Sequence, residues 1–362
     1  MIKFFKKILD VQLYKLPQPN RLLQQELENQ NFSYEIYSLG TEDTFAILIK
    51  SFLIPKRLSK YDVILTSEYF TSFGINLRLL LTLSKVKHVT IGLNQSRRLL
   101  KTKIKLIDRI FDYVFRRTDL VIVHSRREAD LFKDIHNIPA NKFYFSLWGY
   151  DLPESSATRF SRWPKPFVCL IGRNNRDVAT FIKAIDGMNI DGIIITSRDE
   201  TLPEKVPPNV FMFIDLPLNE TLDCIKNALA NAILLKNNDR GAGHITAVAA
   251  MFSGTPQIVS DVAVLRDYFI DGVSAITVSI GDAQAVRIAI EKLMSDRAYS
   301  ERLIANARSY AERWLTNERV IKRITYALTK LVECQELAAV DPEWLEAYES
   351  LKRASNNDVF AA

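Results

Sequence analysis

The sequence predicts an α/β protein with two consecutive domains, each built on a doubly wound parallel sheet. Short apolar runs rich in β-branched residues alternate with longer segments whose apolar positions recur at helical spacing, which is typical of such sheets. A length of 362 residues, with 48% hydrophobic and 25% charged residues, fits about two folded domains. Between the two alternating sets, residues 151–166 contain three prolines and three serines without a period, which indicates a linker.

The first half is predicted to contain five buried strands. These runs are 34–39, 62–67, 88–93, 120–125 and 143–148. The segments NLRLLLTLSK and KLIDRIFDYVFRR have helical spacing and are expected to cover the sheet.

The second half repeats the pattern with six runs and four helical segments. The runs are 167–172, 192–197, 210–215, 232–236, 256–260 and 275–279, and the helical segments are 178–187, 219–229, 245–253 and 283–295. From Ala298 onward the chain is helical and long enough to return to the first domain. We therefore expect domains at 1–155 and 156–315, with C-terminal helices at 316–362 that pack back on the first.

Basic side chains are concentrated in the first half. Residues 1–150 carry 24 basic and 14 acidic side chains, whereas residues 151–362 carry 24 and 28. Within 97–117, eight cations are interleaved with apolar residues, a pattern that suits an anionic membrane surface. A solvated helix face is the alternative, and no recognised nucleic-acid module is present. We expect peripheral membrane contact through 97–117 and no nucleic-acid partner. The N-terminal segment MIKFFKKIL is also basic and amphipathic and could touch the same surface.

Three scattered cysteines, Cys169, Cys224 and Cys334, are too few for a disulfide framework or a zinc site. No apolar stretch reaches the ~20 residues of a membrane span, and no secretion signal is evident. These features predict a cytoplasmic protein with no metal or cofactor, and the basic segment 97–117 adds a peripheral position on the inner face of the plasma membrane.

In the second domain, the residues that follow two strands suit a diphosphate. Ligands of open parallel sheets bind outside the carboxyl ends of the strands, where Arg173 and Arg176 could make forked hydrogen bonds. The GAG turn after 232–236 leads into a helix at Ile245, so that free backbone amides meet the positive end of the helix dipole. Solvated arginines, an Arg176–Asp177 pair and a plain tight turn are the alternatives. The predicted donor-binding residues are Gly172, Asn174, Asp239, Gly241, Gly243, His244, Ile245 and Thr246, with a helix-capping role as the alternative for His244.

In the first domain, Glu68, Asn94 and Gln95 follow strands and are the predicted acceptor-binding residues. Glu68 is the only carboxylate between Asp62 and Asp108, which makes it the candidate for contacting an acceptor hydroxyl. The alternative is a helix-start glutamate that the helix dipole favours.

The order of these motifs resembles a GT-B glycosyltransferase of the glycogen-synthase-like, retaining group 1 superfamily, from about Lys60 to Leu331. The resemblance rests on the Gly172-Arg173 turn with Arg176 and on residues 249–258, which are similar to the family's E-A-M-A-x-G-x-P-V-I segment. Further matches are Val123-His124-Ser125 with Leu131, the turn 147–151, Asp261 and Asp271-Gly272. The chain is a divergent member, because Gly241 and Ala249 stand where the family usually has two glutamates. Asp239 could replace the first.

The resemblance implies two Rossmann-like domains facing a cleft, and a hexosyltransferase that uses a nucleotide-diphosphate sugar. A glycan or lipid-linked acceptor, retention of configuration, independence of metal, and a role in polysaccharide or glycolipid biosynthesis are expected. Arg173, Arg176 and the amides of 241–246 would stabilise the leaving diphosphate. If the configuration were inverted, Glu68 would be the candidate base. The alternative is a catalytically degenerate GT-B protein that acts as a binding or scaffold partner in glycan assembly.

Overall fold

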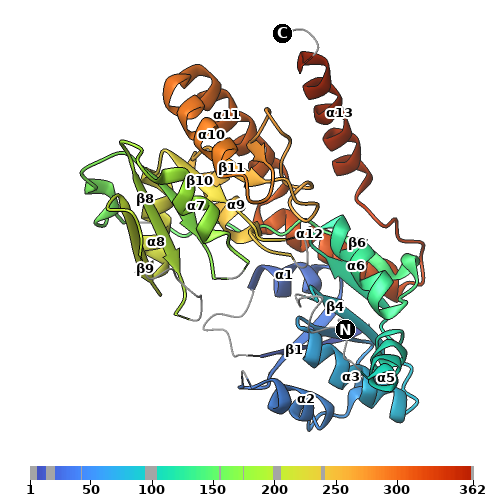
Figure 1. Cartoon of the computed structure of the whole chain (residues 1–362). Coiled ribbons are helices and arrows are strands. Elements are labelled where there is room, and N and C mark those ends of the chain that lie inside the picture. The colour runs from blue at the N-terminus through green and yellow to red at the C-terminus, as the bar shows by residue number, and fades with distance from the viewer. Residues whose placement is uncertain are drawn as a thin grey trace. The chain divides into compact units, whose positions relative to one another are not determined.

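The computed structural model describes residues 6–13, 21–41, 43–93, 104–154, 156–173, 175–198, 205–237 and 241–359. The chain divides into two compact units (Figure 1). Unit 1 comprises Met1–Leu147 and Glu318–Leu345, and unit 2 comprises Trp148–Asn317 and Glu346–Ala362. Residues 346–362 thus group with unit 2, whereas the sequence pattern placed all of 316–362 with the first domain. Tyr348 illustrates the difference, because its hydroxyl donates to the Arg266 carbonyl of unit 2 at 2.5 Å.

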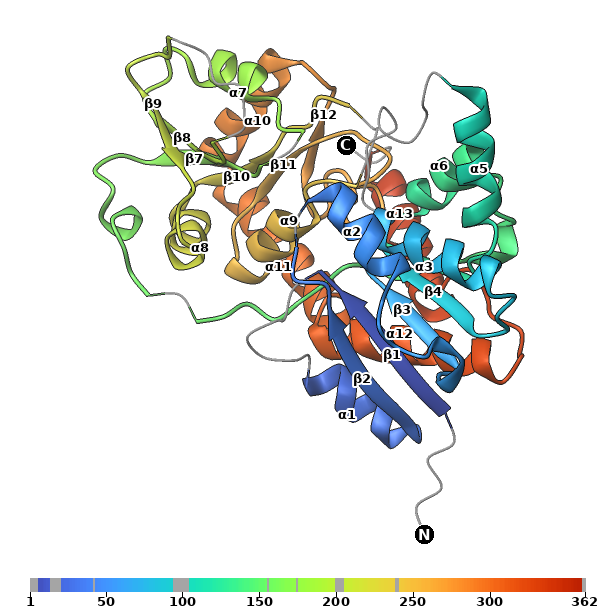
Figure 2. The same ribbon diagram turned by 90° about the horizontal axis from the view of Figure 1, so that it is seen from below.

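Unit 1 contains a six-stranded parallel sheet in the order β2-β1-β3-β4-β5-β6. Figure 2 shows its strands β2, β1, β3 and β4 side by side. Its strands are β1 Lys6–Gln12, β2 Phe32–Ser38, β3 Val63–Thr66, β4 Lys87–Ile91, β5 Leu120–Val123 and β6 Phe143–Phe145. Five of these were predicted, but the interpretation of the N-terminal segment as a membrane-contacting stretch was wrong for residues 6–9. These residues belong to β1, which lies between β2 and β3 and buries Ile8, Leu9 and Val11 completely.

Helices cover both faces of this sheet. They are α1 Arg21–Asn29, α2 Thr44–Phe52, α3 Tyr69–Leu81, α5 Lys105–Phe115, α6 Arg126–His136 and α12 Asn317–Val332. The core on one face joins α1 and α12 to alternate strand residues such as Ile8 and Val63. The core on the other face joins α2 and α3 to the intervening residues, such as Leu9 and Ile64. The two-residue period of the strands therefore divides their side chains between two cores.

Unit 2 contains a second six-stranded parallel sheet, in the order β12-β11-β10-β7-β8-β9. Its strands are β7 Phe167–Ile171, β8 Asp191–Thr196, β9 Val210–Ile214, β10 Ala230–Ile233, β11 Gln257–Ser260 and β12 Ile276–Val278. All six were predicted, and the α/β class with two doubly wound sheets is confirmed. The chain builds outward from β7 in one direction and from β10 in the other, so the neighbours β7 and β10 form a topological switch point.

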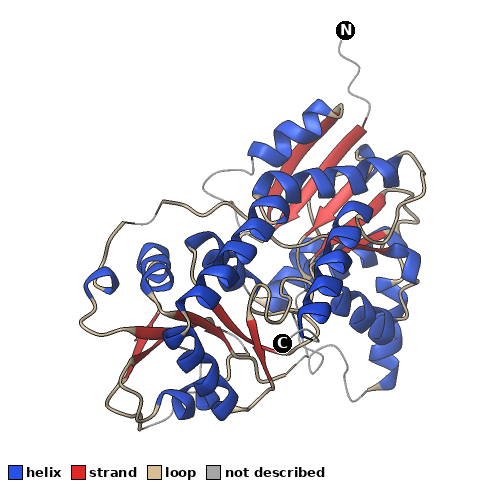
Figure 3. Ribbon diagram, turned by 90° about the horizontal axis from the view of Figure 1, so that it is seen from above, coloured by secondary structure: helices blue, strands red, loops and turns tan. Residues whose placement is uncertain are grey.

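Helices again lie on both faces of the unit 2 sheet (Figure 3). They are α7 Val178–Ile185, α8 Leu218–Asn227, α9 His244–Ser253, α10 Ala283–Ser295 and α11 Arg297–Trp314, and the chain ends with α13 Pro342–Val359. The predicted linker 151–166 packs on this unit, because Phe160 is buried beside α8 and Asp223 accepts hydrogen bonds from Thr158. None of the helices in the described part of the chain is long and apolar enough to cross a membrane.

Candidate functional site

The loops after β7 and β10 lie side by side at the switch point of unit 2. The two strands pair in parallel, with Ala230 opposite Val168 and Ala232 opposite Leu170, so their carboxyl ends share one edge. Beyond the strands, Arg176 and Leu235 form an isolated antiparallel bridge, and the Asp177 amide donates to the Leu234 carbonyl at 2.8 Å. The structure therefore brings the predicted arginine loop against the segment that leads to the glycine turn.

The Arg176 guanidinium is buried and connects β7 to the start of α9. Only 4% of this residue is exposed. Nε donates to the Ile171 carbonyl at 2.8 Å, and Nη2 donates to Thr246 Oγ1 at 3.2 Å. Thr246 Oγ1 in turn donates to the Gly243 carbonyl at 3.0 Å. Arg176 thus fixes the two predicted donor-binding loops to one another.

Gly172 leaves the room that this guanidinium occupies. A Cβ at Gly172 would collide with the guanidinium of Arg176, and its φ of +146° is one that other residues rarely adopt. By contrast, Arg173 is exposed and has no hydrogen-bond or ion-pair partner among the described residues. The two arginines of the predicted pair are therefore in opposite surroundings, and Arg173 is the one that solvent can reach.

The glycine turn leaves the first turn of α9 without a side-chain cap. The helix begins at His244, with Gly243 as N-cap at φ +92°, and within the described ranges no side chain caps it. A Cβ at Gly243 would approach Ile233 Cγ2 to 2.8 Å. Uncapped first-turn amides and the positive end of the helix dipole together favour an anion.

His244 is held by its surroundings. Its Nε2 donates to the Val264 carbonyl at 3.0 Å, and its ring stacks on Tyr268 at 4.6 Å between centroids. The Tyr268 hydroxyl accepts from the Trp148 amide at 2.6 Å. Sequence reasoning missed this support because the tyrosine lies 24 residues away from the histidine with no motif to link them.

This chain is similar to one known protein family and to several solved structures. Residues 197–310 match the family model described as Glycosyl transferases group 1. Sucrose-phosphate synthase from Thermosynechococcus elongatus is similar, with a TM-score of 0.71 at 15% identity over 91% of this chain and 100% of that one. HepE of Anabaena in complex with UDP has a TM-score of 0.67 at 13% identity over 90% and 100%. The chain has the GT-B glycosyltransferase fold.

The resemblance to GT-B glycosyltransferases that the sequence predicted is thus confirmed. A third GT-B neighbour is a glycosyltransferase from Rickettsia africae, with a TM-score of 0.63 at 11% identity over 91% of this chain and 99% of that one. A search of curated protein sequences gave no match. In this GT-B chain, the matched segment 197–310 includes the glycine turn, α9 and most of the unit 2 sheet.

The remaining donor-site candidates of the GT-B chain have different surroundings. Gly241 is buried, and Ile245 is exposed while its carbonyl accepts from the Tyr150 hydroxyl at 3.2 Å. Asn174 and Asp239 lie outside the described residues, as do Asn94 and Gln95 of the predicted acceptor site. Ala249 is 2% exposed within the apolar cluster between the sheet and α8. A glutamate at this position would place a carboxylate in that cluster.

Glu68 of unit 1 is the N-cap of α3. Its Oε2 accepts from the amides of Phe70 and Thr71 at 2.9 and 3.0 Å. This is the helix-start role that the sequence left open as the alternative.

In the described part of the chain, no group of three or more His, Cys, Asp or Glu side chains is arranged to hold a metal ion.

Proposed function

We propose that the protein is a glycosyltransferase that moves a sugar from a nucleotide-diphosphate donor to a glycan or lipid-linked acceptor. The observation that carries this proposal is the meeting of the Gly172 turn and the uncapped start of α9 at the switch point of a GT-B unit. Structures of the similar HepE were determined with UDP and with UDP-glucose. These neighbours support a nucleotide-sugar donor for this chain as well.

Charge stabilisation is the chemistry that this arrangement favours. As the bond from the sugar C1 to the diphosphate oxygen breaks, negative charge develops on the diphosphate. Arg173 and the first-turn amides of α9 would bind that charge, and Arg176 would hold both loops in place and add its own positive field. No step in this scheme uses a metal.

We propose retention of configuration. In this scheme, the acceptor oxygen bonds to C1 on the face that the diphosphate leaves, and its proton passes to a phosphate oxygen. Glu68 would be the candidate base only for inversion. The hydrogen bonds that its carboxylate accepts from the amides of Phe70 and Thr71 leave it less suited to that role. NMR assignment of the product anomer distinguishes the two outcomes.

A donor screen that measures released nucleoside diphosphate tests the activity. We expect turnover with at least one nucleotide sugar and a loss of about 10²-fold in kcat for Arg173→Ala. Arg162→Ala, which changes an exposed arginine in the short turn Phe160–Arg162 of the same unit, is the matched control and should be neutral. Normal turnover of Arg173→Ala would reject this assignment of the site.

A catalytically degenerate scaffold is the second candidate. The buried, apolar position of Ala249 and the glycine at 241 favour it, because neither carboxylate of the family pattern is present. Calorimetry separates the candidates. Metal-independent binding of a nucleoside diphosphate together with turnover supports the enzyme, and an absence of both supports the scaffold.

We also propose that residues 97–117 contact the inner face of an anionic plasma membrane. The described part of this segment includes α5, which exposes Leu106, Ile107, Ile110 and Tyr113 together with Arg109. Exposed apolar and cationic side chains on one helix suit the headgroup region. Flotation with phosphatidylglycerol vesicles should be weakened by Leu106→Ser/Ile110→Ser, and unchanged flotation would reject the contact.

A further inference from the structure

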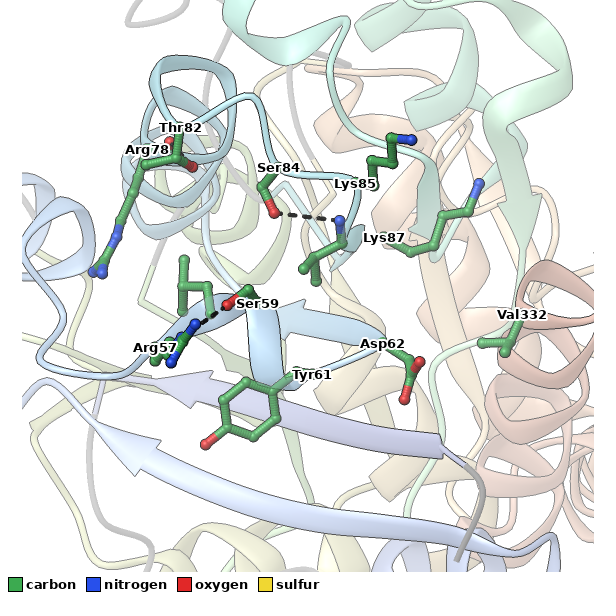
Figure 4. A pocket seen from close by; sticks show the side chains of 12 residues that line it. Arg57, Ser59, Tyr61, Asp62, Arg78, Thr82, Ser84, Lys85, Lys87 and Val332 are labelled. Atoms are coloured by element: carbon green, nitrogen blue, oxygen red, sulfur yellow. Dashed lines mark hydrogen bonds between the residues drawn. The ribbon is translucent and has the colours of Figure 1, made fainter.

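A basic cavity of about 690 Å³ lies in unit 1 at the amino ends of β3 and β4. It forms where the loop after α2 meets the turn between α3 and β4. Figure 4 shows Arg57 and Ser59 from the first segment, Lys85 from the second, and Lys87 at the start of β4. Glu68 follows the carboxyl end of β3, so the cavity lies at the opposite edge of the sheet from the predicted acceptor residues.

Cations dominate the lining of this cavity. Its described lining residues include the cations Arg57, Arg78, Lys85 and Lys87 and one carboxylate, Asp62. Asp62 already accepts from the Lys7 amide at 2.7 Å, and Lys87 lies 3.7 Å from Asp119. Arg57 and Lys85 have no carboxylate partner among the described residues.

The guanidinium of Arg78 gives the cavity a fixed wall. It donates to the Ile54 carbonyl and, at 3.0 Å, to the Lys56 carbonyl. These bonds hold the loop that carries Arg57. The Nε of Arg57 donates to Ser59 Oγ at 3.3 Å. Fixed guanidinium and ammonium groups beside hydroxyls are the donors that bind phosphate oxygens.

Three exposed leucines adjoin this basic lining. Leu53 is the C-cap that follows α2, Leu81 is the last residue of α3, and Leu83 lies between the lining residues Thr82 and Ser84. Leu83 is 89% exposed and has a φ of +48°. It occupies the position after the α3 C-cap, where glycine is favoured because side chains are strained there. Folding of the chain alone gives no reason for a bulky apolar residue at this point.

We propose that this cavity binds the phosphate of an anionic phospholipid headgroup while the three leucines enter the adjoining apolar layer. The cations match the charge of the phosphate, and the leucines distinguish a lipid from a soluble anion. An acidic protein segment or free phosphate would satisfy the charge but would leave Leu83 in water. The cavity is separate from the donor site and from the contact proposed for 97–117. Both membrane contacts require an anionic lipid surface.

Vesicle partitioning of the full chain tests the proposal. We expect binding to vesicles of phosphatidylglycerol in phosphatidylcholine and weak binding to pure phosphatidylcholine. Arg57→Gln/Lys85→Gln and Leu81→Ser/Leu83→Gly should each lower the partition coefficient by about tenfold. Lys183→Gln/Lys226→Gln, two exposed lysines of unit 2, is the matched control. Thermal unfolding verifies that each variant is folded, and Leu83→Gly relieves strain in the backbone.

The outcomes separate the possible sources of the phosphate. Unchanged partitioning of both test variants overturns the proposal. Binding of glycerol phosphate that depends on Arg57 and Lys85, without binding to the vesicles, overturns the lipid as the source. If Leu106→Ser/Ile110→Ser abolishes partitioning while the two cavity variants leave it unchanged, the membrane contact is made by α5 and the cavity proposal is overturned. Turnover with a soluble acceptor should be unaffected by Arg57→Gln/Lys85→Gln, because the cavity is separate from the donor site. Failure of the donor screen would contradict sugar transfer but would leave the proposed lipid binding standing, because vesicle partitioning does not depend on turnover.

Discussion

Arg176 and Gly172 form a pair in which a glycine makes room for a buried charge. The sequence predicted that both arginines after β7 face a ligand, but a sequence pattern cannot say which side chain turns inward. The missing Cβ of Gly172 decides it, because the Arg176 guanidinium occupies that space and reaches Thr246. Arg173 remains exposed. The residue types of this site were predictable, whereas their division into a positioning and an accessible arginine depends on packing.

We expect Gly172→Ala to damage both stability and donor binding. The new Cβ would displace the Arg176 guanidinium and strain the backbone, which should lower the free energy of unfolding by about 1–3 kcal/mol. Gly187→Ala is the matched control, because that glycine has a φ of +74° and no atom of a described residue lies within 4 Å of the added Cβ. Urea unfolding and calorimetry with a nucleoside diphosphate measure the two effects. Equal effects of both substitutions would show that the collision is unimportant.

His88 should make unit 1 sensitive to acid. Burial lowers the pKa of His88 to about 3, while its usual value is about 6.5. Between these pH values the unfolded chain binds a proton at His88 that the folded chain does not. The contribution of neutral His88 to the free energy of unfolding is therefore fully present above about pH 6.5. Between about pH 6.5 and 3, the free energy of unfolding falls by about 1.4 kcal/mol for each pH unit.

Urea titrations of the wild type and His88→Gln between pH 7 and 4.5 measure this effect. We expect the wild type to be the more stable at pH 7 and the difference to shrink as the pH falls. Burial also lowers the pKa of His124, which both proteins share. A difference that stays constant with pH would contradict this role of His88.

At the scale of elements, the two ends of α3 show what local sequence can and cannot predict. The Glu68 cap follows from helix physics and was available as an alternative from the sequence. The strand β1 was missed because Lys6 and Lys7 begin it, and only its place between β2 and β3 buries the residues that follow. Leu83 at the other end of α3 breaks the local preference for glycine. Strands with near-continuous apolar runs were predictable, and elements defined by their neighbours were not.

Leu83→Gly should stabilise the fold while weakening the membrane contact proposed above. Removing the strain of a left-handed leucine should raise the free energy of unfolding by about 1 kcal/mol. The end of α6 offers a control, because Asn137 has a φ of +50° and asparagine tolerates it, so Asn137→Gly should gain less. Urea midpoints compare the two variants. A loss of stability in Leu83→Gly would show that Leu83 makes contacts that matter for the fold.

At the scale of the whole molecule, unit 1 is built from two separate parts of the chain. Residues 318–345 complete it, and α12 contributes Val320, Ile324 and Leu328 to the core beside α1. The sequence predicted this return because a long helical segment follows the last strand. It could not show where the segment rejoins unit 2, since that depends on contacts such as the one from Tyr348.

A chain that ends at Asn317 should lose the order of unit 1. Without α12, one apolar face of the first sheet would be open to water, and we expect amide exchange in β1 and β3–β5 to accelerate strongly. Strands β7–β11 should remain protected, because their core does not include α12. A chain that ends at Leu345 keeps α12 and is the control. Equal protection of unit 1 in both truncations would contradict the role of α12.

The insertion of residues 148–317 between β6 and α12 also has a consequence for biosynthesis. Ribosomes add about 5–20 residues per second, so the first sheet would emerge roughly ten seconds or more before its last covering helix. During that interval the nascent unit 1 exposes the face that α12 later covers. The chain should therefore depend on a holding chaperone during translation, and completion of unit 1 should be a late step that follows synthesis of unit 2.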